Sequence, residues 1–272
     1  MTDTREVRVF VASPDDMRVE RARVEHVVSR LDAEFEGVAR FRAIRYERSF
    51  YTADRTFQAQ IPTPAQCDVV IVIFGHRLGS ELPPDFEERL LDGTPYPSGT
   101  AYELLSSLAA ADARVSAGGD AVPAVYVFRK TAEPRFGPSE EAAFKAAQRE
   151  SARLHDFFDR LFLTPSGGVR RAFHQFAGAD DFEDQVDDLL HQWARRSLRL
   201  PVLWDIEKSG SRFRGLQPFD ARHSRIFFGR DRKVRRALDE LVRTRAREPG
   251  RPFLLVVGPS GSGKSSLVRA GV

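Results

Sequence analysis

The sequence is poor in cysteine and has no long apolar run. Its one cysteine, Cys67, excludes a disulfide framework and a cysteine-rich zinc site. No apolar stretch approaches the roughly 20 residues that a membrane-spanning helix needs. The first residues are charged and lead directly into a strand-like segment, which is not the pattern of a signal peptide. We therefore expect a cytoplasmic protein with no membrane partner.

An alternation of basic and aromatic residues, which is typical of nucleic-acid surfaces, is also missing. The whole chain holds 42 Lys and Arg and 39 Asp and Glu. From Leu200 onward there are 16 Lys and Arg against 7 Asp and Glu, so the part before Leu200 holds 26 Lys and Arg against 32 Asp and Glu. The cations of the basic part are nearly all arginines, scattered over expected helix faces and linkers. Nucleic acid is therefore not an expected partner.

The first 199 residues alternate β-rich runs with helical patterns, which predicts an α/β domain with a flavodoxin-like, five-stranded parallel sheet. In the first helix start, Ser13 is expected to cap and Pro14 to take the first helical position. The segment 67–74 is apolar on both faces, as a central strand must be. We expect strands over 7–12, 41–46, 67–74, 121–128 and 171–176, and helices after 13–16 and over 98–113, 139–161 and 180–198.

Functional residues of such sheets gather at the carboxyl ends of the strands. Ser13 follows the first expected strand, and Ser98 opens the helix after the third. Arg48 and Arg77, also at strand ends, could bind the phosphates of a dinucleotide, although exposed arginines without a ligand are common. These four residues are candidates for a substrate pocket.

A second domain is expected to follow a linker over 200–223 and to begin at residue 224. Its expected elements are a helix over 232–247 and a strand over Phe253–Val257. Next comes a complete GxxxxGK[ST] phosphate loop, Gly258–Ser265, and a helix that starts near Lys264. A strand, this loop and a helix together form the P-loop of NTPases. We expect nucleotide-binding residues at Gly258, Pro259, Ser260, Gly261, Ser262, Gly263, Lys264, Ser265 and Ser266.

Each part of this loop has a role in binding ATP and Mg²⁺. The glycines let consecutive N–H groups point at phosphate oxygens. Lys264 should reach the β- and γ-phosphates, and the Ser265 hydroxyl should bind Mg²⁺. Hydrolysis also needs a carboxylate for Mg²⁺ and a group that orients water, which we expect on later strands. We therefore expect a chain truncated from a larger ATPase, whose last segment binds nucleotide weakly or not at all alone.

The end of the chain resembles the opening of bacterial novel-STAND NTPases. The resemblance rests on Phe228-Gly229-Arg230-Asp231, a helix, and the run from Leu254 to Leu267. Such proteins are signalling switches in which an NTPase module holds an N-terminal effector and C-terminal repeats sense a trigger. The resemblance implies that Phe228, Gly229 and Arg230 lie near the adenine, and that a C-terminal sensor domain is a further partner.

The first domain resembles the TIR-like effectors that precede such modules. The matching pieces are 9–16 with Glu20-Arg21, 67–72 and 98–103. Some TIR domains cleave nicotinamide from NAD⁺ with a glutamate early in the helix after the third strand, and Glu103 has this position. TIR enzymes usually have an aromatic residue and Cys before that glutamate; here Tyr102 could supply the stacking surface.

The resemblances imply a signalling or bacterial defence switch in which ATP-driven oligomerisation activates NAD⁺ hydrolysis. Two other functions for the first domain stay open. It could be a non-enzymatic adaptor that works by homotypic contacts, or a receptor for a nucleotide second messenger.

Overall fold

The computed structural model describes residues 4–44, 63–90, 92–134 and 140–198, and in the C-terminal region 211, 213–215, 217–227, 230, 233–234, 236–238, 240–241 and 253–272. The chain divides into two compact units, Met1–Arg196 and Ser197–Val272, which we describe separately. Among the described helices, none is long and apolar enough to cross a membrane.

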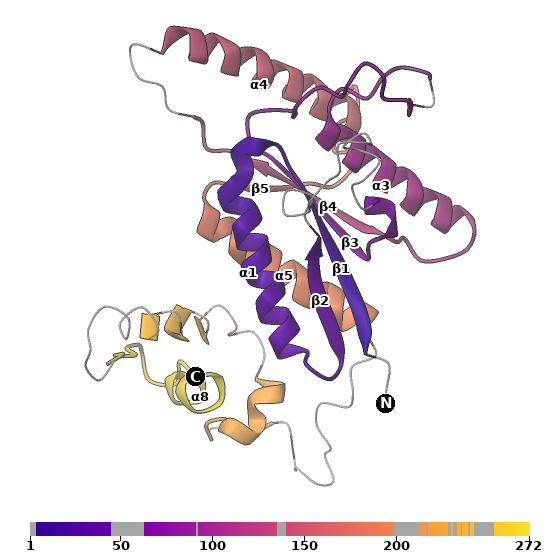
Figure 1. Cartoon of the computed structure of the whole chain (residues 1–272). Helices are drawn as coiled ribbons and strands as arrows, with labels where there is room; N and C mark the ends of the chain where they lie inside the picture. Colours follow the sequence, from indigo (N-terminus) through magenta and orange to yellow (C-terminus); the bar gives the residue numbers. More distant parts are fainter. Residues whose placement is uncertain are drawn as a thin grey trace, which may run out of the picture. The chain divides into compact units, whose positions relative to one another are not determined.

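The first unit is built on a five-stranded, fully parallel sheet (Figure 1). Its strand order is β2-β1-β3-β4-β5. This order, with helices on both faces, confirms the predicted flavodoxin-like α/β fold. The strands are β1 (Arg5–Ala12), β2 (Ala39–Ile44), β3 (Val69–Phe74), β4 (Ala124–Lys130) and β5 (His174–Phe176).

The apolar run of β3 places it at the centre of the sheet. All six of its residues are buried, and it pairs with β1 on one side and β4 on the other. Alternate residues of β3 face opposite layers of helices. Val70, Val72 and Phe74 belong to one core cluster, together with Leu104 and Phe158. The sheet is therefore covered on both faces, as parallel sheets normally are.

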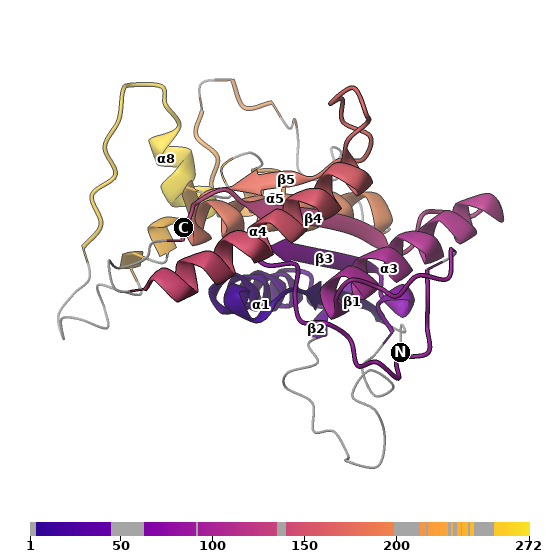
Figure 2. The same cartoon turned by 90° about the horizontal axis from the view of Figure 1, so that it is seen from above.

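Helices cover both faces of the sheet (Figures 1 and 2). On one face lie α3 (Gly99–Ser116) and α4 (Glu141–Phe162). On the other lie α1 (Arg18–Glu34) and α5 (Ala179–Ser197), and Phe182 of α5 packs edge-on against Phe128 of β4 at 5.1 Å. Ser98 caps α3, since its hydroxyl accepts a hydrogen bond from the Ala101 N–H at 3.1 Å.

The expected cap at the first helix is wrong. A 3-10 turn, η1 (Asp15–Met17), precedes α1, and Pro14 rather than Ser13 flanks it. Ser13 instead accepts a hydrogen bond from Arg21 Nη1 at 2.7 Å. The extra turn separates Ser13 from the N–H groups that a helix cap would satisfy.

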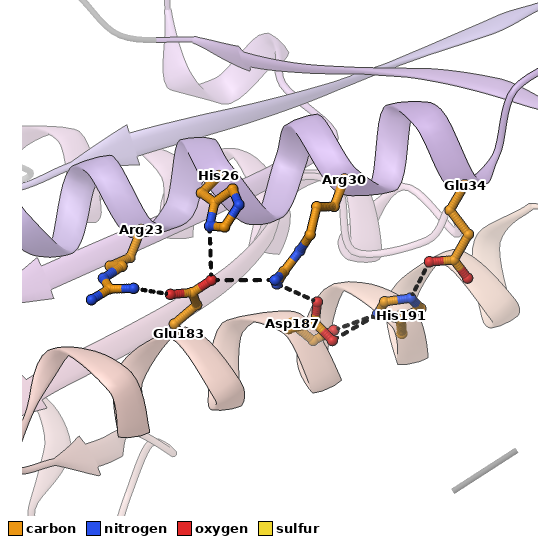
Figure 3. Close-up of polar contacts among 7 residues, drawn as sticks. All are labelled: Arg23, His26, Arg30, Glu34, Glu183, Asp187 and His191. Carbon is orange, nitrogen blue, oxygen red and sulfur yellow. Dashed lines mark hydrogen bonds and ion pairs between the residues drawn. The ribbon is translucent and has the colours of Figure 1, made fainter. Parts of the chain in front are cut away.

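An ion-pair seam joins α1 to α5 (Figure 3). Arg30 lies at its centre: its guanidinium is 3.0 Å from Asp187 Oδ1 and 3.4 Å from Glu183 Oε1. His191 contacts Asp187 on one side and Glu34 on the other. The side chains recur at helical spacing on both helices, so each turn meets its counterpart. The seam consists of Arg23, His26, Arg30 and Glu34 on α1 and Glu183, Asp187 and His191 on α5.

The second unit contains short helical pieces. They are η4 (Ala221–Ile226), α8 (Lys264–Ser266) and a π-helical turn, η5 (Leu267–Gly271), that continues α8. Phe219 and Phe227 pack together at 5.7 Å, and the Phe219 N–H donates to Ser266 Oγ at 3.1 Å. Helix was expected over 232–247, and its described residues 233–234, 236–238 and 240–241 are helical.

The strand expected over Phe253–Val257 is not formed. No described strand pairs with this segment, and Phe253, Leu255 and Val257 are 78%, 69% and 78% exposed. A β-strand needs a hydrogen-bonded neighbour, so apolar sequence alone does not create one. The helix expected from Lys264 is present.

Candidate functional site

The loop from Gly258 to Ser265 has the backbone that its glycines predict. Gly261 and Gly263 have φ values of +77° and +80°, in the left-handed region that favours glycine. Gly263 also flanks α8, so the chain turns at this residue and enters the helix at Lys264. The loop thus turns at left-handed glycines immediately before a helix start, an arrangement that suits phosphate oxygens.

Lys264 folds back over its own loop. Its ammonium donates to the carbonyl oxygens of Gly258 at 2.8 Å and Pro259 at 2.7 Å. These bonds satisfy the ammonium with backbone acceptors of the residues that open the loop. An anion with better acceptors could replace them, because hydrogen bonds between an ammonium and a phosphate are charge-assisted.

A pocket of about 260 Å³ opens beside the loop. Arg230 borders it and donates from Nη2 to the Ser262 carbonyl at 3.3 Å. Lys233, three residues further on, borders it too, although it is not among the nucleotide-binding residues that the sequence predicts. No local pattern identifies it, because its place at the pocket depends on how its segment packs beside the loop. The described lining residues include three cations and no carboxylate.

Four more of the predicted nucleotide-binding residues are Ser265, Ser266, Phe228 and Gly229. Ser265 is exposed, whereas the Ser266 hydroxyl is bonded to the Phe219 N–H. Phe228 and Gly229 lie outside the described residues, so their expected position near the adenine stays a prediction. Among the described residues no group of three or more His, Cys, Asp or Glu side chains is arranged to hold a metal ion.

In the first unit, Glu103 lies in the second turn of α3 and is 4% exposed. Its backbone carbonyl accepts a hydrogen bond from the Ser107 hydroxyl at 2.6 Å. Ser98, also buried, donates from its hydroxyl to the Leu78 carbonyl at 2.7 Å. Glu103 thus lies near the start of the helix, where the NAD⁺ hypothesis places the catalytic glutamate, but it is buried, and catalysis by Glu103 stays a prediction.

Tyr102 holds the long loop that precedes α3. Its ring packs edge-on against Phe86 and Tyr96, with centroids 5.0 Å apart in each pair, and its hydroxyl donates to Glu88 Oε1 at 2.9 Å. Burial, and then this hydrogen bond, raise the pKa of Tyr102 well above its usual range. The ring that we expected to stack on substrate is therefore engaged with the loop.

Phe86 and Tyr96 also line a cleft of about 500 Å³ between this loop and α4. Arg153 of α4 borders the cleft and donates to the Pro97 carbonyl at 3.2 Å. Glu103 is not among the lining residues. The described cleft and the candidate catalytic carboxylate are thus separate.

The carboxyl ends of β1 and β3 are filled by the chain itself. Arg21, 3% exposed, holds both the Ser13 hydroxyl and the Pro14 carbonyl through Nη1. At the end of β3, a side chain at Gly75 would overlap Met17 Cε, so η1 covers this end closely. Ser13 is therefore buried and bonded within the protein.

Arg77 is the other strand-end candidate that the structure describes. Arg77 is exposed, and Arg48 lies outside the described residues. The structure instead reveals an ion pair at the end of β4, where Lys130 Nζ lies 2.8 Å from Glu20 Oε1 of α1. The Glu20 side chain is 2% exposed. This pair had no sequence signal, because its members are 110 residues apart.

Comparison with known families gives one finding. Residues 213–272 match the family described as Novel STAND NTPase 1. The match includes the phosphate loop, Arg230 and Lys233, and it supports the STAND NTPase assignment of this segment. No curated protein and no solved structure matches the chain.

Proposed function

We propose that the protein is a nucleotide-controlled switch of the STAND type, whose second unit binds ATP through Gly258–Ser265. The observation that carries this proposal is the phosphate loop itself, within a segment that matches Novel STAND NTPase 1. The backbone N–H groups of the loop would hold the phosphates. Lys264 would leave the carbonyls of Gly258 and Pro259 for the β- and γ-phosphates, and Ser265 would hold Mg²⁺.

This proposal covers binding rather than hydrolysis. The described pocket lining holds no carboxylate that could bind Mg²⁺ or orient an attacking water. Weak affinity is therefore expected, because the metal would have few protein ligands at the loop. The loop and its cations would still distinguish phosphate-bearing ligands from nucleosides.

Titration of a fluorescent ATP analogue by anisotropy, with unlabelled ATP as competitor, tests this step. We expect saturable binding that Lys264→Ala weakens by about 10-fold or more, the effect of losing hydrogen bonds from a charged group. Lys145→Ala is the control, because this exposed lysine pairs only with Glu141 on α4 among the described residues. Equal binding by wild type and Lys264→Ala would exclude the loop as the site.

We further propose that the first unit is the effector, and that it hydrolyses NAD⁺ when protomers assemble. Glu103 would stabilise the positive charge that develops on the ribose as nicotinamide leaves. The support is its position near the start of α3, in a sheet of TIR-like strand order. Assembly is part of the proposal because Met17 and Arg21 fill the strand ends in the described chain.

The filled carboxyl ends of β1 and β3 favour a second candidate function for the first unit, that of a non-enzymatic adaptor. An adaptor needs only a rigid surface for homotypic contacts, and Tyr102 and Ser98 are both bonded within the fold. An assay of nicotinamide release from NAD⁺ distinguishes the enzyme from the adaptor. The release is measured by chromatography, at high protein concentration and with ATP present. The enzyme requires a rate that falls at least 100-fold in Glu103→Gln. Glu36→Gln, an exposed change just after α1, should leave it unaltered.

A further inference from the structure

The pocket beside the phosphate loop carries more positive charge than one lysine supplies. Arg230, Lys233 and Lys264 all border it, and no carboxylate is among its described lining residues. Such a pocket favours ligands in proportion to their negative charge.

The three cations differ in how they are held. Lys264 donates to two carbonyls of its loop, and Arg230 donates to the Ser262 carbonyl. Lys233 is exposed, and the described residues that line the pocket with it include no carboxylate. Its backbone is fixed, because its N–H donates to the Arg230 carbonyl at 2.9 Å. Lys233 thus brings to the pocket, on a positioned backbone, a charge that no carboxylate among the described lining residues pairs with.

We propose that Lys233 is a specificity residue that favours the nucleotide with the more highly charged phosphate tail. The inference rests on the proposed binding of nucleotide by Gly258–Ser265. It makes Lys233 the residue through which this segment distinguishes ATP from ADP, which differ by one phosphate and about one unit of charge.

The size of the effect follows from Coulomb's law. For unit charges about 6 Å apart at an effective dielectric constant of about 40, the interaction corresponds to about a tenfold change in affinity. Removing the Lys233 ammonium should therefore weaken ATP about tenfold more than ADP. Added salt should shrink this difference, because an exposed charge is screened.

The experiment measures the dissociation constants of ATP and ADP for the whole chain, at low salt with Mg²⁺. In Lys233→Met the ratio of the ADP constant to the ATP constant should fall about tenfold relative to wild type. Lys233→Arg, which keeps the charge, should preserve the ratio within about threefold. Arg236→Met is the matched control, since Arg236 is an exposed cation of the same helical segment that does not line the pocket. Melting curves confirm that each variant is folded.

Two results would overturn the inference but not the proposed function. An unchanged ratio of the two constants in Lys233→Met, which includes equal losses for ATP and ADP, would show that Lys233 does not select the phosphate tail. An equal shift in Arg236→Met would assign the effect to overall charge. In each of these cases wild type still binds ATP and Lys264→Ala still weakens that binding, so the proposed function survives. Absence of saturable binding by wild type would instead overturn both.

Discussion

The ion-pair seam between α1 and α5 allows one substitution to be worked out in detail. Arg30 lies between two acids of α5, 3.0 Å from Asp187 and 3.4 Å from Glu183 (Figure 3). The Asp187 side chain is 2% exposed. Arg30→Met removes the charge, keeps most of the aliphatic length, and leaves Asp187 buried with one cation fewer.

Removing one partner of a fully buried ion pair costs about 3–5 kcal/mol. Arg30 is 26% exposed, and Asp187 keeps a contact with His191 at 3.1 Å. We therefore expect a smaller loss, about 2–3 kcal/mol in the free energy of unfolding. At about 2–4 °C per kcal/mol for a unit of this size, the melting temperature should fall by about 5–10 °C.

Urea unfolding followed by far-UV circular dichroism measures the loss, and hydrogen exchange of α5 locates it. Arg40→Met is the control: Arg40 is 60% exposed and pairs with Asp32 at 3.2 Å, so it should cost less than about 1 kcal/mol. Asp187→Asn added to Arg30→Met should recover part of the loss, because it removes the buried carboxylate charge that Arg30 had paired. Equal losses in Arg30→Met and Arg40→Met would refute the reasoning.

Three further substitutions or treatments test other parts of the first unit. Burial raises the pKa of Cys67 to about 11, so the thiol of the native protein at pH 8 should be alkylated far more slowly than the thiol of the protein in urea. Because the pKa is higher in the folded state, the free energy of unfolding should fall between about pH 9 and 11, and Cys67→Ala should remove this fall. Tyr102→Phe deletes the hydrogen bond to Glu88 but keeps the ring, and should cost about 0.5–1.5 kcal/mol in urea unfolding; no loss would mean that the hydroxyl does not hold the loop. Gly75→Ala should destabilise by about 1–3 kcal/mol because its methyl overlaps Met17, and failure of Met17→Ala to relieve that loss would contradict the close packing.

The fold could be predicted where a local sequence pattern is enough to indicate how a segment is buried. The segment of β3 is apolar at every position, and this pattern identified a central strand. The expected strand over 171–176 is shorter in the structure, since only His174–Phe176 pair with β4. The strand expected over Phe253–Val257 is absent for a related reason. Pairing depends on a neighbour far away in the sequence, which no local pattern contains.

In the candidate sites too, local patterns could be predicted from the sequence and tertiary contacts could not. The phosphate loop is contiguous, so its glycines and Lys264 could be identified from spacing alone. Lys233 could not, because its place at the pocket depends on how a helical segment packs beside the loop. The contacts of Tyr102 come from a loop without periodicity, where side-chain partners have no sequence signal.

The closed strand ends connect the two proposals for the first unit. In flavodoxin-like sheets a ligand binds where neighbouring strands lead in opposite directions, here outside β1 and β3. Met17 fills the space at the end of β3, and Arg21 is hydrogen-bonded to Ser13 and Pro14 after β1. A ligand would therefore have to displace η1. An enzyme built on this edge would thus be inactive until something moves η1, whereas an adaptor would need no movement. A displacement of η1 is therefore a structural consequence of the NAD⁺ hypothesis.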